Sequence, residues 1–320
     1  MKKGCFAGIG CSGIIIIILF ALAIIDFISD LDISFDGFTE SDQDYSFKVD
    51  SLDNQAVIKS DFNLKFTSSS LGRKNYKISF HLLEKEVKAA LAYLDEVANL
   101  SERELNINQT YKNDQIYYTK LIWHEIYKRI YWQAFDKLDN IVKGFNEIFS
   151  KEKLSDRDKV YFIISFVQNI EYKRPGGKLD ILPPLGTLAA KFGDCDTKAL
   201  LLYILLEKAG VDCVMFWSFQ YKHAMLGAAL NSGGKYKSHK GKKYFFIETT
   251  YPGWNIGDID PEMDDLNLWY VDDLDSDKMK IDYKYDSYEN DTDQFDKDGD
   301  YNKNETEDSG KHDKASPSDN

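Results

Sequence analysis

The chain has 320 residues, 43% of them hydrophobic, so it can bury a core in one good-sized domain or two small ones. Its formal charge is −13, but the segment from Asp272 to Asn320, with 17 acidic and 7 basic residues, supplies −10 of it. The rest of the chain has no basic surplus, which argues against nucleic acid as a partner.

The N-terminus contains a candidate membrane anchor. From Cys5 to Ile25 there are 21 residues without a charge, which matches the roughly 20 needed to cross the hydrocarbon core as a helix. Two lysines precede this run, so the positive-inside rule puts residues 1–4 in the cytoplasm and the body of a single-pass protein outside the cell membrane. The alternative is a cleaved signal peptide, because Ala21-Leu22-Ala23 resembles a cleavage site. The apolar run continues beyond these residues, which favours the uncleaved anchor.

Residues 27–150 contain two kinds of pattern. Up to about residue 75 the chain is acidic and serine-rich with short alternating stretches, which indicates short strands or a tether. From Leu82 to Ser150 apolar residues recur three and four positions apart, which predicts helices. The stretch 117–149 fits either one long helix or two packed ones.

The segment 152–262 begins with a clear helix signal. Ser155 followed three residues later by Asp158 is a near capping box, and a regular apolar stripe comes after it. A second helix is expected at residues 195–209 and is ended by Gly210, a residue favoured just beyond a helix C-terminus.

Three runs typical of strands follow this second helix, at residues 211–219, 223–230 and 242–250. The glycine- and lysine-rich residues 231–242 between the last two runs read as a hairpin loop. A helix followed by antiparallel strands predicts an α+β fold. From residue 272 to 320 the chain is highly charged with few aliphatic residues, which predicts a disordered acidic tail.

Cys195 stands where the apolar helix 195–209 is expected to begin. The nucleophilic form of cysteine is the thiolate, and a helix N-terminus favours negative charge, so this position is expected to lower the pKa of the thiol. A helix that is apolar all round must be buried and would hold the cysteine rigidly. A small buried side chain remains the alternative for a lone cysteine.

Two further residues make Cys195 a candidate nucleophile. His223 opens the strand at 223–230, and Glu248 lies near the end of the strand at 242–250. Adjacent antiparallel strands can bring these two side chains together beside the helix N-terminus. A thiol nucleophile needs a base, usually histidine, held by a third group. The predicted catalytic set is therefore Cys195, His223 and Glu248.

The segments that carry these residues resemble the transglutaminase-like superfamily, in a microbial membrane-anchored form. The stretches "TLAAKFGDCDTKALLLYILLEKAGVD" and "YFFIETTYPGWNIGDI", with a strand-initial histidine between them, follow the order of that family's motifs over about residues 152–262. Two positions depart from the common pattern. Glu248 is followed by Thr249 where many members have Asp followed by Pro or Ala, and Lys222 precedes His223 where a small residue is commoner.

The resemblance implies a papain-like fold, with the cysteine helix packed on an antiparallel sheet, and a Cys-His-acid triad. It implies that an amide bond of a protein or cell-envelope peptide is cleaved or transferred through a thioester, without a cofactor or metal. The alternative is a catalytically silent domain of the same fold that binds peptides or envelope polymer. A structural surface protein assembled through residues 82–150 is a third hypothesis. The oligomeric state is open.

Several other residues are interpreted more simply. Asp194 and Asp196 are expected to cap the helix and complement its dipole. Trp217 and Trp254 are expected to pack in the core rather than line a groove, and Cys213 is expected to be buried and inert. His124 has no second metal ligand at helical spacing. The tail motif "DKDGDYNKNETE" lacks the glycine that an EF-hand loop needs at its sixth position.

Overall fold

The computed structural model describes residues 41–47, 56–68, 72–101, 103–105, 107 and 114–274. The predicted anchor at 5–25 and nearly all of the predicted tail lie outside these residues, as does the EF-hand-like motif. Within the described ranges, no helix has the length and apolar character needed to cross a bilayer.

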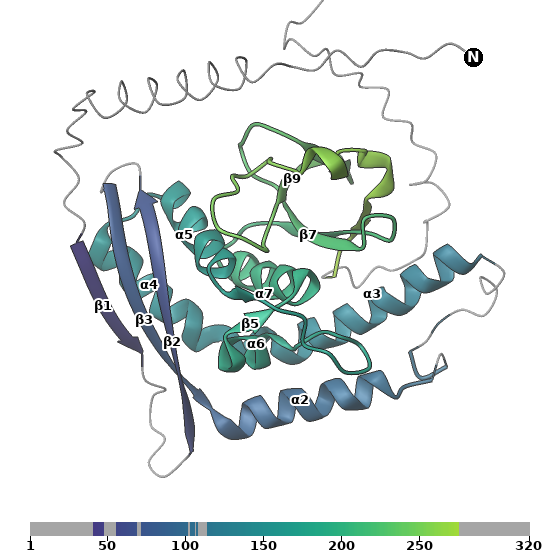
Figure 1. Ribbon diagram of the computed structural model, residues 1–320, viewed down its shortest axis with the longest axis horizontal. Coiled ribbons are helices and arrows are strands. Elements are labelled where there is room, and N and C mark those ends of the chain that lie inside the picture. The colour runs from purple at the N-terminus through teal and green to yellow at the C-terminus, as the bar shows by residue number, and fades with distance from the viewer. Residues whose placement is uncertain are drawn as a thin grey trace, which may run out of the picture. The chain divides into compact units, whose positions relative to one another are not determined.

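The first described elements are three strands, β1 (Ser41–Phe47), β2 (Val57–Ser68) and β3 (Gly72–Leu83). They form a sheet of order β1-β3-β2 in which β2 is antiparallel and β1 is parallel to β3 (Figure 1). Exposed and buried residues alternate along β2, as expected when one face of a strand covers a core. The described residues before α2 therefore form strands rather than a tether, and β2 and β3 are longer than the short strands that the sequence predicted.

Helices follow in the region where the sequence predicts them. They are α2 (Glu84–Ala98), α3 (Gln115–Ala134) and α4 (Asp139–Glu152), with a short 3₁₀ turn η2 (Phe135–Leu138) between the last two. The stretch 117–149 is thus two helices rather than one.

The next helix, α5 (Asp156–Gln168), begins at the predicted cap, where the Asp158 amide donates to the Ser155 hydroxyl at 3.2 Å.

The second half of the described chain forms a five-stranded antiparallel sheet of order β10-β6-β7-β9-β8. Its members are β6 (Cys213–Ser218), β7 (His223–Ala228), β8 (Tyr236–His239), β9 (Lys242–Ile247) and β10 (Tyr270–Asp272). The prediction of a hairpin loop at residues 231–242 is partly wrong, because these residues include the strand β8. The smaller elements are β4 (Glu171–Tyr172), α6 (Pro184–Ala190), β5 (Phe192–Gly193), η3 (Pro261–Met263) and η4 (Leu266–Leu268).

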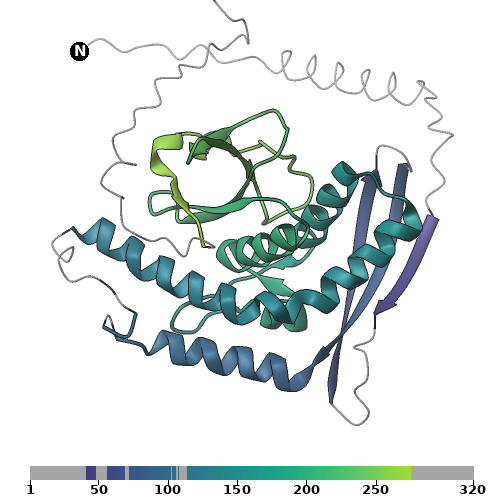
Figure 2. The ribbon, with the colours of Figure 1, turned by 180° about the vertical axis from the view of Figure 1, so that it is seen from behind.

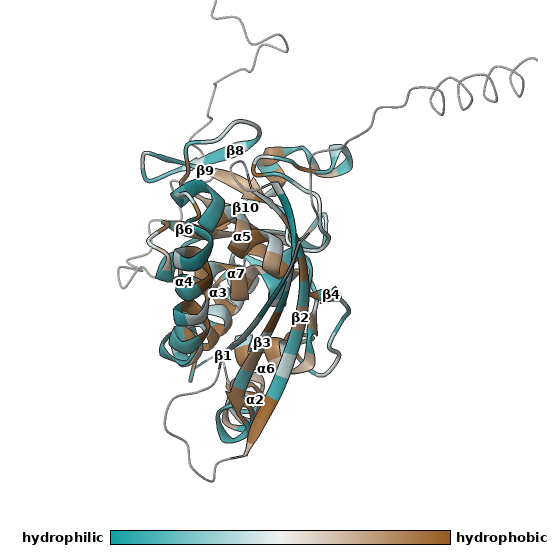
Figure 3. Ribbon diagram, turned by 90° about the vertical axis from the view of Figure 1, so that its left-hand side faces the viewer, coloured by the Kyte–Doolittle hydropathy of each residue, from teal (hydrophilic) through white to brown (hydrophobic). Residues whose placement is uncertain are grey.

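Helix α7 (Cys195–Lys208) is the central element. Nearly all of its residues are buried, as its largely apolar sequence predicts, and hydrophobic residues predominate along it (Figure 3). It contacts β6 and β7 on one side and α5 on the other, and α5 in turn contacts β2 (Figures 1 and 2). The described chain is therefore a mixed α+β structure, and its central helix starts at the candidate nucleophile.

Candidate functional site

Cys195 is the first residue of α7 and is only 8% exposed. Asp194 caps the helix: its Oδ1 accepts a hydrogen bond from the Thr197 amide at 3.1 Å. Gly193 leaves room for this turn, since a Cβ there would lie 2.5 Å from the Thr197 methyl group. The expected capping role of Asp194 is thus present, and Asp196 lies in the first turn of the helix.

His223 and Glu248 form the predicted histidine–carboxylate pair. His223 is the first residue of β7, and Glu248 directly follows β9, the neighbouring strand. Nε2 of the imidazole lies 2.8 Å from Oε2 of the carboxylate, and about a tenth of each side chain is exposed. The two strands therefore bring together residues that are 25 positions apart.

The other oxygen of Glu248 is fully engaged. Oε1 accepts hydrogen bonds from the Thr249 amide at 2.8 Å, the Thr250 amide at 2.8 Å and the Thr250 hydroxyl at 2.7 Å. Burial opposes ionisation of Glu248, but the hydrogen bonds from His223 and Thr250 outweigh it and lower the pKa of this carboxyl. An ionised carboxylate only accepts hydrogen bonds, so Nε2 of His223 must carry the proton in this contact. In the neutral ring, Nδ1 is then the basic nitrogen.

Helix α7 packs against β7, and the backbone N–H of Ala224, the residue after His223, is near enough to the Cys195 sulphur to favour its thiolate. The side-chain hydrogen bond of Cys195 goes to Asp196 Oδ1 at 3.2 Å, and Asp196 Oδ2 accepts from the Tyr127 hydroxyl of α3 at 2.6 Å. The structure thus brings the cysteine next to the histidine-bearing strand, with its thiol proton directed to Asp196.

The expectation of a lowered Cys195 pKa is wrong for this state of the protein. Burial, followed by the negative charges of Asp196 and Asp194, raises the pKa of the thiol well above its ordinary value. Burial also raises the pKa of Asp194 to about 6. The helix N-terminus is where the sequence predicted it, but the acidic side chains on both sides of the cysteine favour the neutral thiol.

Two polar networks next to the site were not predicted. Lys198, one turn along α7, is fully buried and donates to three backbone carbonyl oxygens. Gln168 of α5 donates from Nε2 to the carbonyls of Glu248 and Trp254 at 2.9 and 3.0 Å. The only sequence signal for Lys198 was a charged residue directly before the apolar run 199–206 of a buried helix.

His124 has a partner that the sequence did not indicate. It is 2% exposed, and its Nδ1 pairs with Asp272 Oδ1 of β10, 148 residues away. Burial opposes protonation, but Asp272 outweighs it and raises the pKa of His124. No group of three His, Cys, Asp or Glu side chains with metal-binding geometry occurs in the described part of the chain.

Aromatic side chains border the candidate triad. Tyr172 of β4 and Tyr251 are 36% and 57% exposed, and their ring centroids lie 5.6 Å apart. Tyr172 pairs with Gly193 of β5, two residues before Cys195, so the tyrosine pair lies near the start of α7. Burial, then Cys195 and Asp194, raise the pKa of Tyr172 to about 12. Trp217 is 7% exposed and packs in the core, as expected.

The remaining predicted residues have structural roles. Trp254, which was expected in the core, is instead half-buried and belongs to neither hydrophobic cluster. Cys213 is 1% exposed, as predicted, and burial raises its pKa. Both described cysteines, Cys195 and Cys213, are free thiols.

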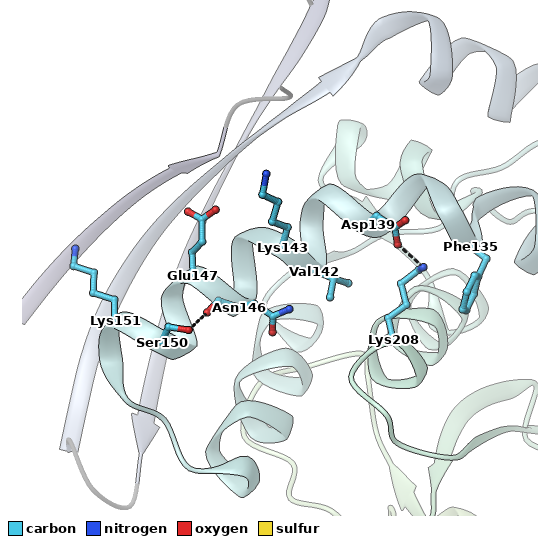
Figure 4. Close-up of a pocket in the computed structure, with 9 residues that line it drawn as sticks. All are labelled: Phe135, Asp139, Val142, Lys143, Asn146, Glu147, Ser150, Lys151 and Lys208. Carbon is cyan, nitrogen blue, oxygen red and sulfur yellow. Dashed lines mark hydrogen bonds and ion pairs between the residues drawn. The ribbon is translucent and has the colours of Figure 1, made fainter. Parts of the chain in front are cut away.

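A surface groove lies at the opposite end of α7 from Cys195, along one side of α4 (Figure 4). Its polar lining includes an ion pair between Lys208 and Asp139 at 2.6 Å. The lining contains no cysteine or histidine, so this groove has no nucleophile or base of the kind found at the start of α7.

Protein-family models, curated proteins and solved structures contain no match to this chain.

Proposed function

We propose that the protein is a thiol enzyme that cleaves or transfers amide bonds through a thioester on Cys195. One observation carries the proposal: Nε2 of His223 is hydrogen-bonded to a Glu248 carboxylate whose other oxygen accepts three hydrogen bonds, and Cys195 begins the helix that packs against the strand opened by His223. The arrangement supplies a nucleophile, a base and an orienting acid, as acyl transfer by a thiol requires. A papain-like core of the transglutaminase-like type, as the sequence motifs suggest, belongs to this proposal.

The proposed reaction starts from a neutral thiol. As sulphur attacks the acyl carbon of the substrate, Nδ1 of His223 takes the thiol proton, and the C–N bond breaks as the imidazolium gives that proton to the leaving amine. Water or an amine then attacks the thioester; His223 takes a proton from this nucleophile and returns it to the departing sulphur. The raised pKa of Cys195 fits a base that acts during attack better than a thiolate formed in advance.

The proposed substrate is a protein or cell-envelope peptide. The exposed pair Tyr172 and Tyr251 beside the cysteine offers a surface on which a peptide can pack. Hydrolysis is the default outcome because water is the abundant acceptor. We keep the N-terminal segment as the anchor of a single-pass protein whose body is extracytoplasmic, on the strength of the apolar run at residues 5–25.

A binding module with a silent triad is the second candidate. The observation that favours it is the buried thiol of Cys195, which is 8% exposed and donates to Asp196 instead of His223. A binding module would need the fold but not the proton transfer, so His223 would not influence the chemistry of the thiol.

The two candidates differ in the reactivity of Cys195. In the enzyme, iodoacetamide should modify Cys195 in the folded full-length protein, and His223→Ala should slow the reaction by at least about tenfold near neutral pH. Cys213 serves as the internal control because its buried thiol should stay unmodified in both proteins. Equal rates for Cys195 in the wild type and the variant would favour the binding module.

A further inference from the structure

Lys198 is a buried lysine one helical turn after Cys195. Its side chain is 0% exposed, and Nζ donates to the carbonyl oxygens of Gln168 at 3.2 Å, Ile170 at 2.7 Å and Thr250 at 2.8 Å. A lysine ammonium has three N–H donors, so the three oxygens match its hydrogen-bonding capacity. A buried charge is costly even when its hydrogen bonds are complete. Methionine could fill a similar volume without that cost.

The three acceptors come from two separate parts of the chain. Gln168 is the last residue of α5 and Ile170 follows it closely, whereas Thr250 lies in the segment after β9. Lys198 itself belongs to the first turns of α7. One ammonium group therefore ties the end of α5 and the segment after β9 to the helix that carries Cys195.

Thr250 connects this ammonium to the candidate triad. Its carbonyl accepts from Lys198, while its amide and hydroxyl donate to Glu248 Oε1 at 2.8 and 2.7 Å. The other oxygen of Glu248 pairs with His223. A displacement of Thr250 would therefore change the direction in which the carboxylate faces the imidazole.

Gln168 provides a second tie to the same segment. Its Nε2 donates to the carbonyls of Glu248 and Trp254, on either side of Thr250 along the chain. The segment is thus held from α7 by Lys198 and from α5 by Gln168. Both contacts are made to backbone atoms, so they define where the segment lies rather than which side chains it carries.

We infer that Lys198 is a positioning residue that holds Thr250, and through it the Glu248 carboxylate, in line with His223. This inference rests on the proposed function of the Cys195, His223 and Glu248 set. The charge on Lys198 also lies close enough to Glu248 for the carboxylate to raise the lysine pKa against the larger effect of burial, which lowers it to about 7. Lys198 acts through Glu248 and touches no reacting atom.

The test compares two lysines of the same helix. Lys198→Met removes the ammonium next to the triad, and Lys208→Met removes the ammonium that pairs with Asp139 at the other end of α7. The first readout is the ¹⁵N NMR spectrum of the histidine rings in the full-length protein, with the His223 signal assigned through His223→Ala. The second readout is the rate of Cys195 modification by iodoacetamide at pH 7.

In the wild type, the neutral His223 ring should carry its proton on Nε2, as the contact with Glu248 requires. Lys198→Met should give a mixture of the two ring tautomers and slow modification of Cys195 by about tenfold, comparable to the lower end of the loss when a residue that orients a metal ligand is removed. Lys208→Met should leave both readouts as in the wild type. A purely structural role would lower the melting temperature in both variants without changing the tautomer.

The inference is overturned if folded Lys198→Met keeps the wild-type tautomer and the wild-type rate of Cys195 modification, while His223→Ala lowers that rate. If His223→Ala also leaves the rate of Cys195 modification unchanged, the proposed function fails instead. The tautomer of His223 then still decides whether Lys198 orients the pair. Should Lys198→Met not fold, Gln168→Met removes the second tie to the same segment. That variant should shift the tautomer in the same direction, and a wild-type spectrum from it would overturn the inference.

Discussion

The thiol of Cys195 lies 3.2 Å from Oδ1 of Asp196, the next residue along the chain, and donates its hydrogen bond to it. The same carboxylate accepts a hydrogen bond from Tyr127 through its other oxygen at 2.6 Å. A tyrosine from α3 thus holds a carboxylate against the candidate nucleophile. The negative charge disfavours the thiolate, so Asp196 keeps Cys195 protonated until a base removes the proton.

Replacing Asp196 with Asn should make Cys195 more reactive at neutral pH. Asparagine keeps an acceptor for Tyr127 but removes the negative charge, which should lower the raised pKa of the thiol. At a pH below the pKa, each unit by which the thiol pKa falls gives about a tenfold larger thiolate fraction. Measuring the iodoacetamide rate of Cys195 between pH 6 and 9 tests this. Asp264→Asn, at a partly exposed position paired with Lys235, is the control. A rate in Asp196→Asn equal to or below that of the wild type would contradict the role given to Asp196.

Glu248 should make folding stability depend on acid pH. Its pKa in the folded protein is lowered, so its contribution is fully present above the unfolded value near 4.5 and is lost as the pH falls through the lower folded value. Glu248→Gln should therefore cost about 1.5–3 kcal/mol at pH 7, the range for hydrogen bonds to a charged group. The difference between wild type and variant should shrink below about pH 4.5.

Urea unfolding of both proteins at pH 7 and at pH 3.5 measures this difference. Glu147→Gln on the exposed side of α4 is the matched control and should change stability by less than about 0.5 kcal/mol at either pH. A difference between Glu248→Gln and the wild type that stays constant across both pH values would show that Glu248 is not ionised through these contacts.

Lys222 occupies a backbone position that suits glycine. It precedes His223, is exposed and has φ of 50°, in the left-handed region that costs a residue with a Cβ about 1–2 kcal/mol. Glycine at this position lowers folding stability by about 0.5–1 kcal/mol, because it has greater conformational freedom in the unfolded chain. Lys222→Gly should therefore raise stability by about 0.5–1 kcal/mol, and a thermal melt measures it. Lys88→Gly, at an exposed position inside α2, should instead lower stability by about 1 kcal/mol. Equal losses of stability in the two variants would show that the left-handed backbone at Lys222 carries no strain.

The same backbone angle explains one departure from the sequence pattern. The family that the motifs resemble commonly has a small residue before the histidine, and the structure has a left-handed turn at that position. Lys222 adopts this turn at the cost of its Cβ strain, and its side chain is exposed. The departure therefore concerns backbone strain at the entrance to β7, and the pairing of His223 with Glu248 is intact.

Several features were predictable because they depend on residues close in sequence. The apolar residues of α7 required its burial, Ser155 and Asp158 marked the start of α5, and alternating or apolar runs marked β6, β7 and β9. Likewise, the pairing of His223 with Glu248 followed from two neighbouring strands and one buried carboxylate. The strand β8 was missed because its lysines and glycine-rich surroundings resemble a loop, whereas its pairing with β9 supplies the hydrogen bonds.

By itself, the sequence determined that a cysteine begins a buried helix, that a histidine opens one nearby strand and that a glutamate stands at the end of another. Tertiary structure alone decided the protonation preference of that cysteine and the orientation of that glutamate. The first depends on burial, on the two flanking aspartates and on Tyr127, 69 residues from Asp196. The second depends on Lys198 and Gln168, whose acceptors come from segments up to 86 residues away. Helical and strand periodicity reports which face of an element is buried, but a pKa and a hydrogen-bond direction depend on every charge and donor within a few ångströms, whatever its position in the chain.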